Sequence, residues 1–169
     1  MRTIKFRSTR VRASVAVVMI GLLTVDPAWA EVCARPHERT ALSSRVLQTE
    51  LMVAALCCGN RPLYNAFVTK FRGELVKQGR SLRSFFQRHH GGGGEENLNS
   101  FITRLANEAS RRSNAERAGF CAQASLLFRQ LLHNKRLNFE TLLDSPTLTM
   151  RHSILSCGAK VKNGYSELW

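Results

Sequence analysis

The chain has 169 residues, of which 25 are Lys or Arg and 12 are Asp or Glu, so its formal net charge at pH 7 is +13. Hydrophobic residues make up 44% of the chain, which is too high a fraction for a disordered basic tail. The length allows one domain and excludes large enzyme folds such as the (β/α)₈ barrel.

The first 30 residues have the three parts of a secretory signal peptide. Five basic residues and no acidic residue lie within positions 1–12, and a mostly apolar run follows over 13–25. Ala28-Trp29-Ala30 then places small residues at the two positions that a signal peptidase reads. The apolar run is too short to cross a bilayer core of about 30 Å. We therefore predict cleavage after Ala30 and export to the periplasm or the extracellular space, rather than a stable membrane span.

The predicted mature domain covers residues 31–169 and keeps a strong positive charge. Its 20 basic and 11 acidic residues leave a net charge of +9. An exported basic protein meets anionic envelope components or acidic proteins, so we do not expect nucleic acid as its partner.

Two helices are predicted in the first half of this domain. Apolar residues recur at helical spacing over 36–58 in two adjacent stripes, which predicts a well-buried helix. A second helix is expected over 62–89, kinked or divided because Gly73 and Gly79 lower its helix propensity. Four consecutive glycines at 91–94 predict a flexible linker outside any regular element.

Two more main helices and a short one are predicted in the second half. Apolar spacing over 98–109 predicts the third helix, and the capping-box spacing of Ser113 and Glu116 predicts the start of the fourth. Ser145-Pro146 begins a short C-terminal helix that runs to Cys157-Gly158, and a polar tail covers 158–169. Sustained strand alternation is missing from the sequence. The predicted fold class is all-α, an up-down bundle of four main helices plus a short C-terminal helix.

All five cysteines lie in the mature domain, where export favours disulfides over metal sites. A helix over 36–58 separates its ends by roughly 30 Å, so Cys33 cannot reach the cysteines at the other end. In an up-down bundle, the end of the first helix and the start of the fourth lie at one pole. This geometry favours Cys58 or Cys57 with Cys121, and Cys33 with Cys157. Pairing of Cys33 with Cys121 and of Cys58 with Cys157 stays open, and Cys57 is the expected free thiol.

Candidate catalytic chemistry is sparse. His89-His90 and the vicinal Cys57-Cys58 could bind a metal or handle thiols, although no established ligand spacing supports a metal site. Glu50, Glu74 and Asp144 are carboxylates without a sequence reason to meet. Nucleophile elbows, P-loops and dinucleotide fingerprints do not occur. We therefore expect no catalytic residue, no metal site and no cofactor.

The densest basic stretch is the candidate site for an anionic partner. Its members are Arg72, Lys77, Arg80, Arg83 and Arg88. The leading hypothesis is a non-enzymatic binding module for a partner protein or an anionic envelope component. The alternative is a small thiol- or metal-handling protein that uses Cys57, Cys58, His89 and His90.

Overall fold

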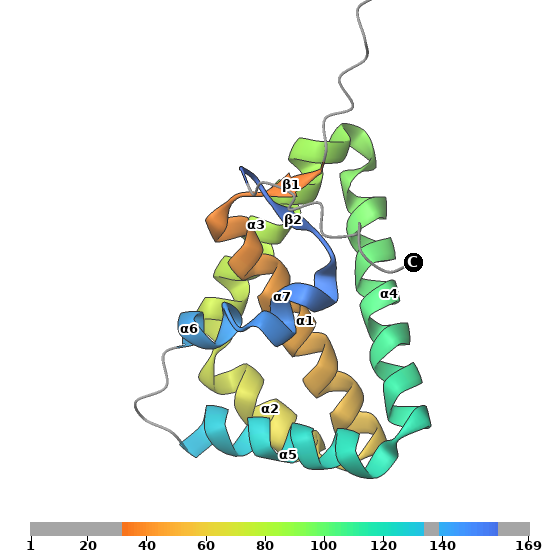
Figure 1. Ribbon diagram of the computed structural model, residues 1–169. Helices are drawn as coiled ribbons and strands as arrows, with labels where there is room; N and C mark the ends of the chain where they lie inside the picture. Colours follow the sequence, from red (N-terminus) through yellow and green to blue (C-terminus); the bar gives the residue numbers. More distant parts are fainter. Residues whose placement is uncertain (1–31, 134–138, 159–169) are drawn as a thin grey trace, which may run out of the picture. The chain divides into compact units, whose positions relative to one another are not determined.

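The structure, a computed structural model, describes residues 32–133 and 139–158. Figure 1 shows the arrangement of the described elements, which are almost all helical. In chain order they are β1 (Cys33–Ala34), α1 (Pro36–Cys57), α2 (Arg61–Lys70), α3 (Arg72–His90), the 3₁₀ turn η1 (Gly91–Gly93), α4 (Gly94–Ala115), α5 (Arg117–His133), α6 (Phe139–Leu143), α7 (Pro146–His152) and β2 (Leu155–Ser156). The predicted signal segment 1–30 and most of the polar tail lie outside the described residues.

α1 is the central helix, and every other α-helix of the described chain packs against it. Its buried side chains point in all directions, as the two apolar stripes predict, and several of them are the small polar residues Ser43, Ser44 and Thr49. Four fully buried phenylalanines from the surrounding helices complete the core: Phe67, Phe85, Phe101 and Phe128. Because α1 is buried on all sides, helices from both halves of the described chain pack against it.

The expected second helix is divided into α2 and α3, but the division lies at Phe71 rather than at the glycines. Phe71 stacks on Phe139 with ring centroids 4.7 Å apart. The neighbouring Lys70 Nζ donates hydrogen bonds to the carbonyls of Leu131 and Leu132, at 2.6 and 3.0 Å. These contacts with distant segments set the break, whereas Gly73 and Gly79 lie inside α3.

The expectation that residues 91–94 lie outside regular structure is wrong. Gly91–Gly93 form η1, and Gly94 is the buried first residue of α4. A Cβ atom on Gly94 would lie 2.9 Å from the Cα of Gln87, so the turn from α3 into α4 requires glycine there. Gly94 therefore permits the close approach of α3 and α4.

The boundary between α4 and α5 also differs from the capping-box prediction. α4 continues through Ser113 to Ala115, and Ser113 is buried inside it. Glu116 is the residue that caps α5, because its Oε1 accepts a hydrogen bond from the Gly119 N–H at 2.8 Å. The helix therefore begins three residues later than predicted.

The C-terminal segment returns to the start of α1. α7 begins at Pro146 as predicted but ends at His152, where Ser153 takes a left-handed conformation with φ of 58°. Cys157 follows the strand β2 rather than ending a helix. β1 and β2 form a two-residue parallel pair in which Cys33 lies opposite Leu155, an element that the sequence analysis did not predict.

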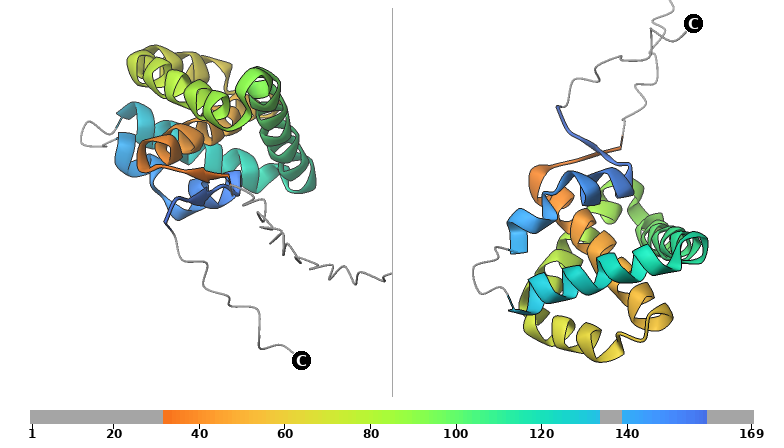
Figure 2. Two further views of the ribbon diagram at one scale, coloured as in Figure 1. Left: turned by 90° about the horizontal axis from the view of Figure 1, so that it is seen from above. Right: turned by 60° about the horizontal axis from the view of Figure 1, so that its bottom comes forward.

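The all-α fold class and its disulfide staples are confirmed. α1, α3 and α4 alternate in direction, and Figures 1 and 2 show α5 crossing one end of this group beside α2. Within the described ranges, the helices include none with the length and apolar character needed to cross a membrane.

Candidate functional site

Two disulfides hold the two ends of α1. Cys33 is bonded to Cys157 with the Cα atoms 4.9 Å apart, and Cys58 to Cys121 with the Cα atoms 5.7 Å apart. This is the pairing favoured when the end of the first helix and the start of the fourth lie at the same end of an up-down bundle. Cys57 is a free, half-buried thiol, and its Sγ lies 3.5 Å from the Sγ of Cys58.

The sulfur atoms of Cys57, Cys58 and Cys121 form a cluster in which all three lie within 4.8 Å of one another. The buried hydroxyl of Ser113 donates a hydrogen bond to the Cys57 Sγ at 3.0 Å. Because two of these sulfurs are joined in a disulfide, one thiol is available for a metal ion. A zinc site uses three or four protein ligands, so the arrangement favours thiol chemistry over zinc binding.

The histidine pair does not join the sulfur cluster. His89 Nε2 makes a hydrogen bond with the carbonyl oxygen of Cys33 at 3.1 Å, beside the beginning of α1. Cys57 ends the same helix, 22 residues long, which corresponds to a separation of about 33 Å. His90 stacks on Phe86 with ring centroids 6.0 Å apart. A site that combines Cys57 and Cys58 with the two histidines is therefore excluded by the position of α1 between them.

The three candidate carboxylates each face a cation rather than one another. Glu50 accepts hydrogen bonds from Arg112 and Arg151. Glu74 lies 3.8 Å from the Nζ of Lys77, and Asp144 lies 3.9 Å from a guanidinium nitrogen of Arg39. This arrangement gives no pair of carboxylates for acid–base catalysis.

The structure separates the five candidate basic residues of α3 by the partners they have. Arg88, at the edge of the face that packs on the bundle, donates two hydrogen bonds to the buried carboxylate of Glu38, at 3.1 and 2.5 Å. Lys77 is exposed and lies 3.5 Å from the Glu140 carboxylate of α6. Arg88 and Lys77 therefore connect α3 to neighbouring elements of the bundle.

Glu38, in the first turn of α1, is the buried carboxylate that binds Arg88. Burial raises the pKa of Glu38, but hydrogen bonds from the Arg35 N–H and the Arg88 guanidinium outweigh burial and hold the pKa below its usual value. The Arg35 N–H donates to the same carboxylate at 2.8 Å. The ion pair therefore persists at neutral pH and keeps Arg88 directed at the bundle.

The outer face of α3 carries the other three arginines. Arg72, Val76, Arg80, Arg83 and Gln87 follow one another at spacings of four, four, three and four residues, and all five are exposed. We call this set the outer α3 face. Within residues 32–133 and 139–158, Arg72 and Arg80 make no ion pair, and Arg83 lies 3.4 Å from the exposed Glu95.

Val76 is the member of the outer α3 face that the sequence analysis missed. Its side chain is 50% exposed and lies between basic residues on the same helix face. The helical spacing of Arg72, Val76 and Arg80 was visible in the sequence. The residue spacing did not show that this side of the helix is exposed to solvent.

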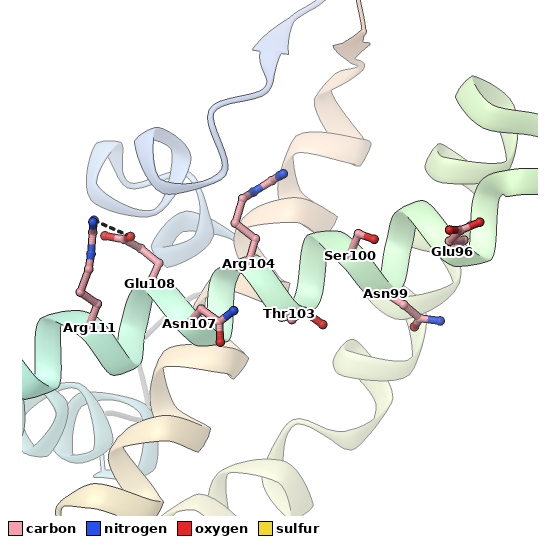
Figure 3. Close-up of a pocket in the computed structure, with 8 residues that line it drawn as sticks. All are labelled: Glu96, Asn99, Ser100, Thr103, Arg104, Asn107, Glu108 and Arg111. Atoms are coloured by element: carbon pink, nitrogen blue, oxygen red, sulfur yellow. Dashed lines mark hydrogen bonds and ion pairs between the residues drawn. The ribbon is translucent and has the colours of Figure 1, made fainter.

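A second exposed surface follows α4 and has a different charge character. Figure 3 shows its eight polar side chains along a single helix, with Glu108 accepting a hydrogen bond from Arg111 at 2.6 Å. Two acidic residues, Glu96 and Glu108, balance two arginines, Arg104 and Arg111. The α4 surface is therefore neutral overall and does not favour an anionic partner.

Comparisons of this chain with protein-family models, with curated proteins and with solved structures gave no match.

Proposed function

We propose that this protein is an exported, non-enzymatic binding module whose outer α3 face binds an acidic surface of a partner protein. The observation that carries the proposal is the grouping of Arg72, Arg80 and Arg83 around the exposed Val76. Two of the three arginines make no ion pair within the described ranges, so their charges are available to a partner.

The chemistry of the outer α3 face favours a protein over a simple anionic polymer. Protein interfaces combine an apolar centre with a polar rim, and arginine is enriched in them. Val76 supplies the apolar centre and the arginines supply the rim. The planar guanidinium group also binds carboxylates in a bidentate manner, which suits Asp and Glu side chains of a partner.

Export is part of the proposal. The two disulfides are typical of proteins from oxidising compartments. The charged start, the short apolar run and Ala28-Trp29-Ala30 are typical of a signal peptide. We propose cleavage after Ala30 and a location in the periplasm or outside the cell.

The proposal is tested with a triple variant, Arg72→Gln with Arg80→Gln and Arg83→Gln. The matched control removes three exposed arginines from elsewhere, Arg104→Gln with Arg117→Gln and Arg129→Gln. Wild-type protein, immobilised without its signal segment, is incubated with the exported protein fraction of its own cells at low and high salt. We expect an acidic protein to be retained at low salt by the wild type and by the control, and released at high salt.

Loss of this protein from the outer-face variant alone supports the proposal. Equal retention by both variants overturns it. Val76→Ser is expected to weaken retention without changing net charge. Binding to polyglutamate and to vesicles of anionic lipid is measured in parallel. If the outer-face variant loses binding to the acidic protein, to polyglutamate and to the vesicles equally, the face binds anionic surfaces in general rather than a protein.

The sulfur cluster supports a second candidate function, thiol–disulfide exchange. In such an exchange the Cys57 thiolate attacks the Sγ of Cys121, a Cys57–Cys121 bond forms, and Cys58 leaves as a thiolate. The Cys58 thiolate then takes up the proton that Cys57 released, so no external oxidant is needed. The supporting observation is that all three sulfurs lie within 4.8 Å of one another.

Alkylation of the folded, unreduced protein tests this second candidate. Exchange predicts that the alkyl group is found on both Cys57 and Cys58 after fragmentation, with a share on Cys58 that grows with pH. Alkylation of Cys57 alone at every pH would exclude exchange. Cys57→Ser provides the control, because it removes the attacking thiol and leaves both disulfides in place.

A further inference from the structure

A small cavity lies on the side of α1 that is covered by α5 and by the C-terminal segment. Both α5 and α7 pack against α1 (Figure 1). Residues of these three helices line the cavity, together with Leu142 of α6 and Ser145. The cavity has a volume of about 180 Å³. Its apolar lining comes from four helices and consists of Leu51, Phe120, Ala124, Leu127, Leu142 and Leu148. The polar lining residues are Glu50, Gln123, Ser145 and Arg151.

The cavity has a charged rim. Glu50 and Arg151 line it, and their side chains are 17% and 25% exposed, whereas Leu51 and Leu148 are buried. Arg151 donates through Nη1 to Glu50 at 2.5 Å, and Arg112 donates to the same carboxylate oxygen. The cavity is therefore apolar inside and polar where it meets solvent.

The charges at this rim are unequal. The Glu50 carboxylate is shared by two guanidinium groups, those of Arg112 and Arg151. Arg112 also pairs with Glu108, but Glu108 shares its charge with Arg111. Three arginines thus share two carboxylates, which leaves one surplus positive charge in the network to which Arg151 belongs. A ligand with one negative charge balances it.

We propose that this cavity binds a small organic monocarboxylate, with its apolar group between α5 and α7 and its carboxylate on Arg151. An engineered apolar cavity of about 150 Å³ in another protein binds benzene. A cavity of about 180 Å³ therefore accommodates a phenyl ring or a short acyl chain. A guanidinium group has five N–H donors in a planar fork, and within the described ranges Arg151 uses Nη1 for Glu50.

This ligand site is independent of the outer α3 face. The cavity residues come from α1, α5, α6, α7 and the Ser145 turn, and none of them belongs to α3. Failure of the partner-binding test leaves the cavity proposal unaffected, and the reverse is also true.

Calorimetric titration of the oxidised mature protein with phenylacetate and with hexanoate tests the proposal. The controls are 2-phenylethanol, which keeps the ring without the charge, and acetate, which keeps the charge without the apolar group. We expect at least one of the two carboxylates to bind, and both controls to bind at least about tenfold more weakly. 2-Phenylethanol loses hydrogen bonds between charged groups, which contribute at least this factor, and acetate loses the burial of the apolar group.

Two variant pairs locate the site. Ala124→Leu fills the cavity, and Ala122→Leu adds the same atoms at an exposed position two residues away. Arg151→Gln removes the positive charge, and Arg151→Lys keeps it. Circular dichroism checks that the variants are folded. We expect Ala124→Leu to abolish binding, Ala122→Leu to preserve it, and Arg151→Lys to bind more tightly than Arg151→Gln.

Three results would overturn the proposal. These are equal binding of phenylacetate and 2-phenylethanol, unchanged binding in the Ala124→Leu variant, or no heat from either carboxylate at the limit of its solubility with folded wild-type protein.

Discussion

Glu38 shows how one side chain can set the position of several others. It lies in the first turn of α1, is buried, and accepts hydrogen bonds from the Arg35 N–H and from Arg88 of α3. The carboxylate thus caps the amide end of α1 and joins α3 to it, across 50 residues of chain. A side chain with both roles is expected to contribute more to the free energy of unfolding than a surface ion pair does.

We predict that Glu38→Gln lowers the free energy of unfolding by roughly 2–3 kcal/mol. Breaking a fully buried ion pair costs about 3–5 kcal/mol, and this pair is discounted because the Arg88 side chain is 32% exposed. Urea unfolding at pH 7 measures the change. Glu95→Gln is the control, because Glu95 pairs with Arg83 at an exposed position and its loss should change stability by about 0.5 kcal/mol or less.

The same variant has a characteristic pH dependence. Because the folded pKa of Glu38 lies below its usual value of 4.5, its stabilising effect is present above pH 4.5 and is lost as the pH falls through the lower folded pKa. Wild type and Glu38→Gln should therefore converge in stability in acid. A constant difference between them down to the lowest pH would contradict the role assigned to the charge.

His152 titrates in a different pH range. Its side chain is 2% exposed, Nδ1 accepts a hydrogen bond from the Ile154 N–H, and Nε2 has no partner within the described ranges. Burial and, to a smaller extent, the positive charge of Arg39 together lower the pKa of His152 to about 4. The ring is therefore neutral in the folded protein over most of the acidic range.

We predict that stability decreases as the pH falls from 6.5 to about 4, because the unfolded chain takes up a proton on His152 that the folded chain excludes. The full decrease is about 3 kcal/mol by the usual conversion of pKa shifts. His152→Asn keeps an acceptor near Nδ1 and should flatten the decrease in thermal unfolding experiments. His133→Asn, at an exposed position, should leave the pH profile unchanged, and an identical profile for His152→Asn would refute the assignment.

At the scale of elements, the junction between α4 and α5 contains two residues that depend on each other. Glu116 caps α5 through the Gly119 N–H, and a Cβ on Gly119 would lie 2.0 Å from Glu116 Oε2. Alanine at position 119 must therefore displace the capping side chain. The glycine is required only while the glutamate caps the helix.

This dependence predicts non-additive effects on stability in a double-mutant cycle. Glu116→Ala should destabilise by about 1 kcal/mol through loss of the cap. Gly119→Ala alone should be close to neutral, because loss of the cap offsets a gain in helix propensity of about 1 kcal/mol. In the Glu116→Ala background the same Gly119→Ala change should stabilise by about that amount. Additive effects of the two changes on urea unfolding would contradict the steric coupling.

Helix positions were predictable because apolar periodicity is local, and helix ends were less so because distant contacts set them. The start of α7 at Pro146 follows from the sequence, whereas the break at Phe71 depends on stacking with Phe139. The candidate site was predictable to the same extent. The outer α3 face is visible in the spacing of its residues, but the engagement of Arg88 by Glu38 joins positions 50 residues apart.

At the scale of the whole described chain, α1 is held at both ends. The Cys33–Cys157 disulfide, with β1 and β2, fixes the C-terminal segment beside the start of α1. The Cys58–Cys121 disulfide fixes the start of α5 beside the end of α1. The two bonds close loops with sequence separations of 124 and 63 residues. Loop entropy assigns them about 5 and about 4 kcal/mol of stability.

Loss of each disulfide should increase amide hydrogen exchange in a different part of the described chain. Without the Cys33–Cys157 bond, the strand pair of two residues and the short α7 are the main links between the C-terminal segment and α1. We therefore predict that Cys33→Ser with Cys157→Ser increases amide hydrogen exchange chiefly in β1, β2 and α7, while α3 and α4 stay protected. In contrast, Cys58→Ser with Cys121→Ser should increase exchange in α5 and at the end of α1. Cys57→Ser retains both bonds and should match the wild type, and a uniform increase in both double variants would show that the bundle opens as one unit.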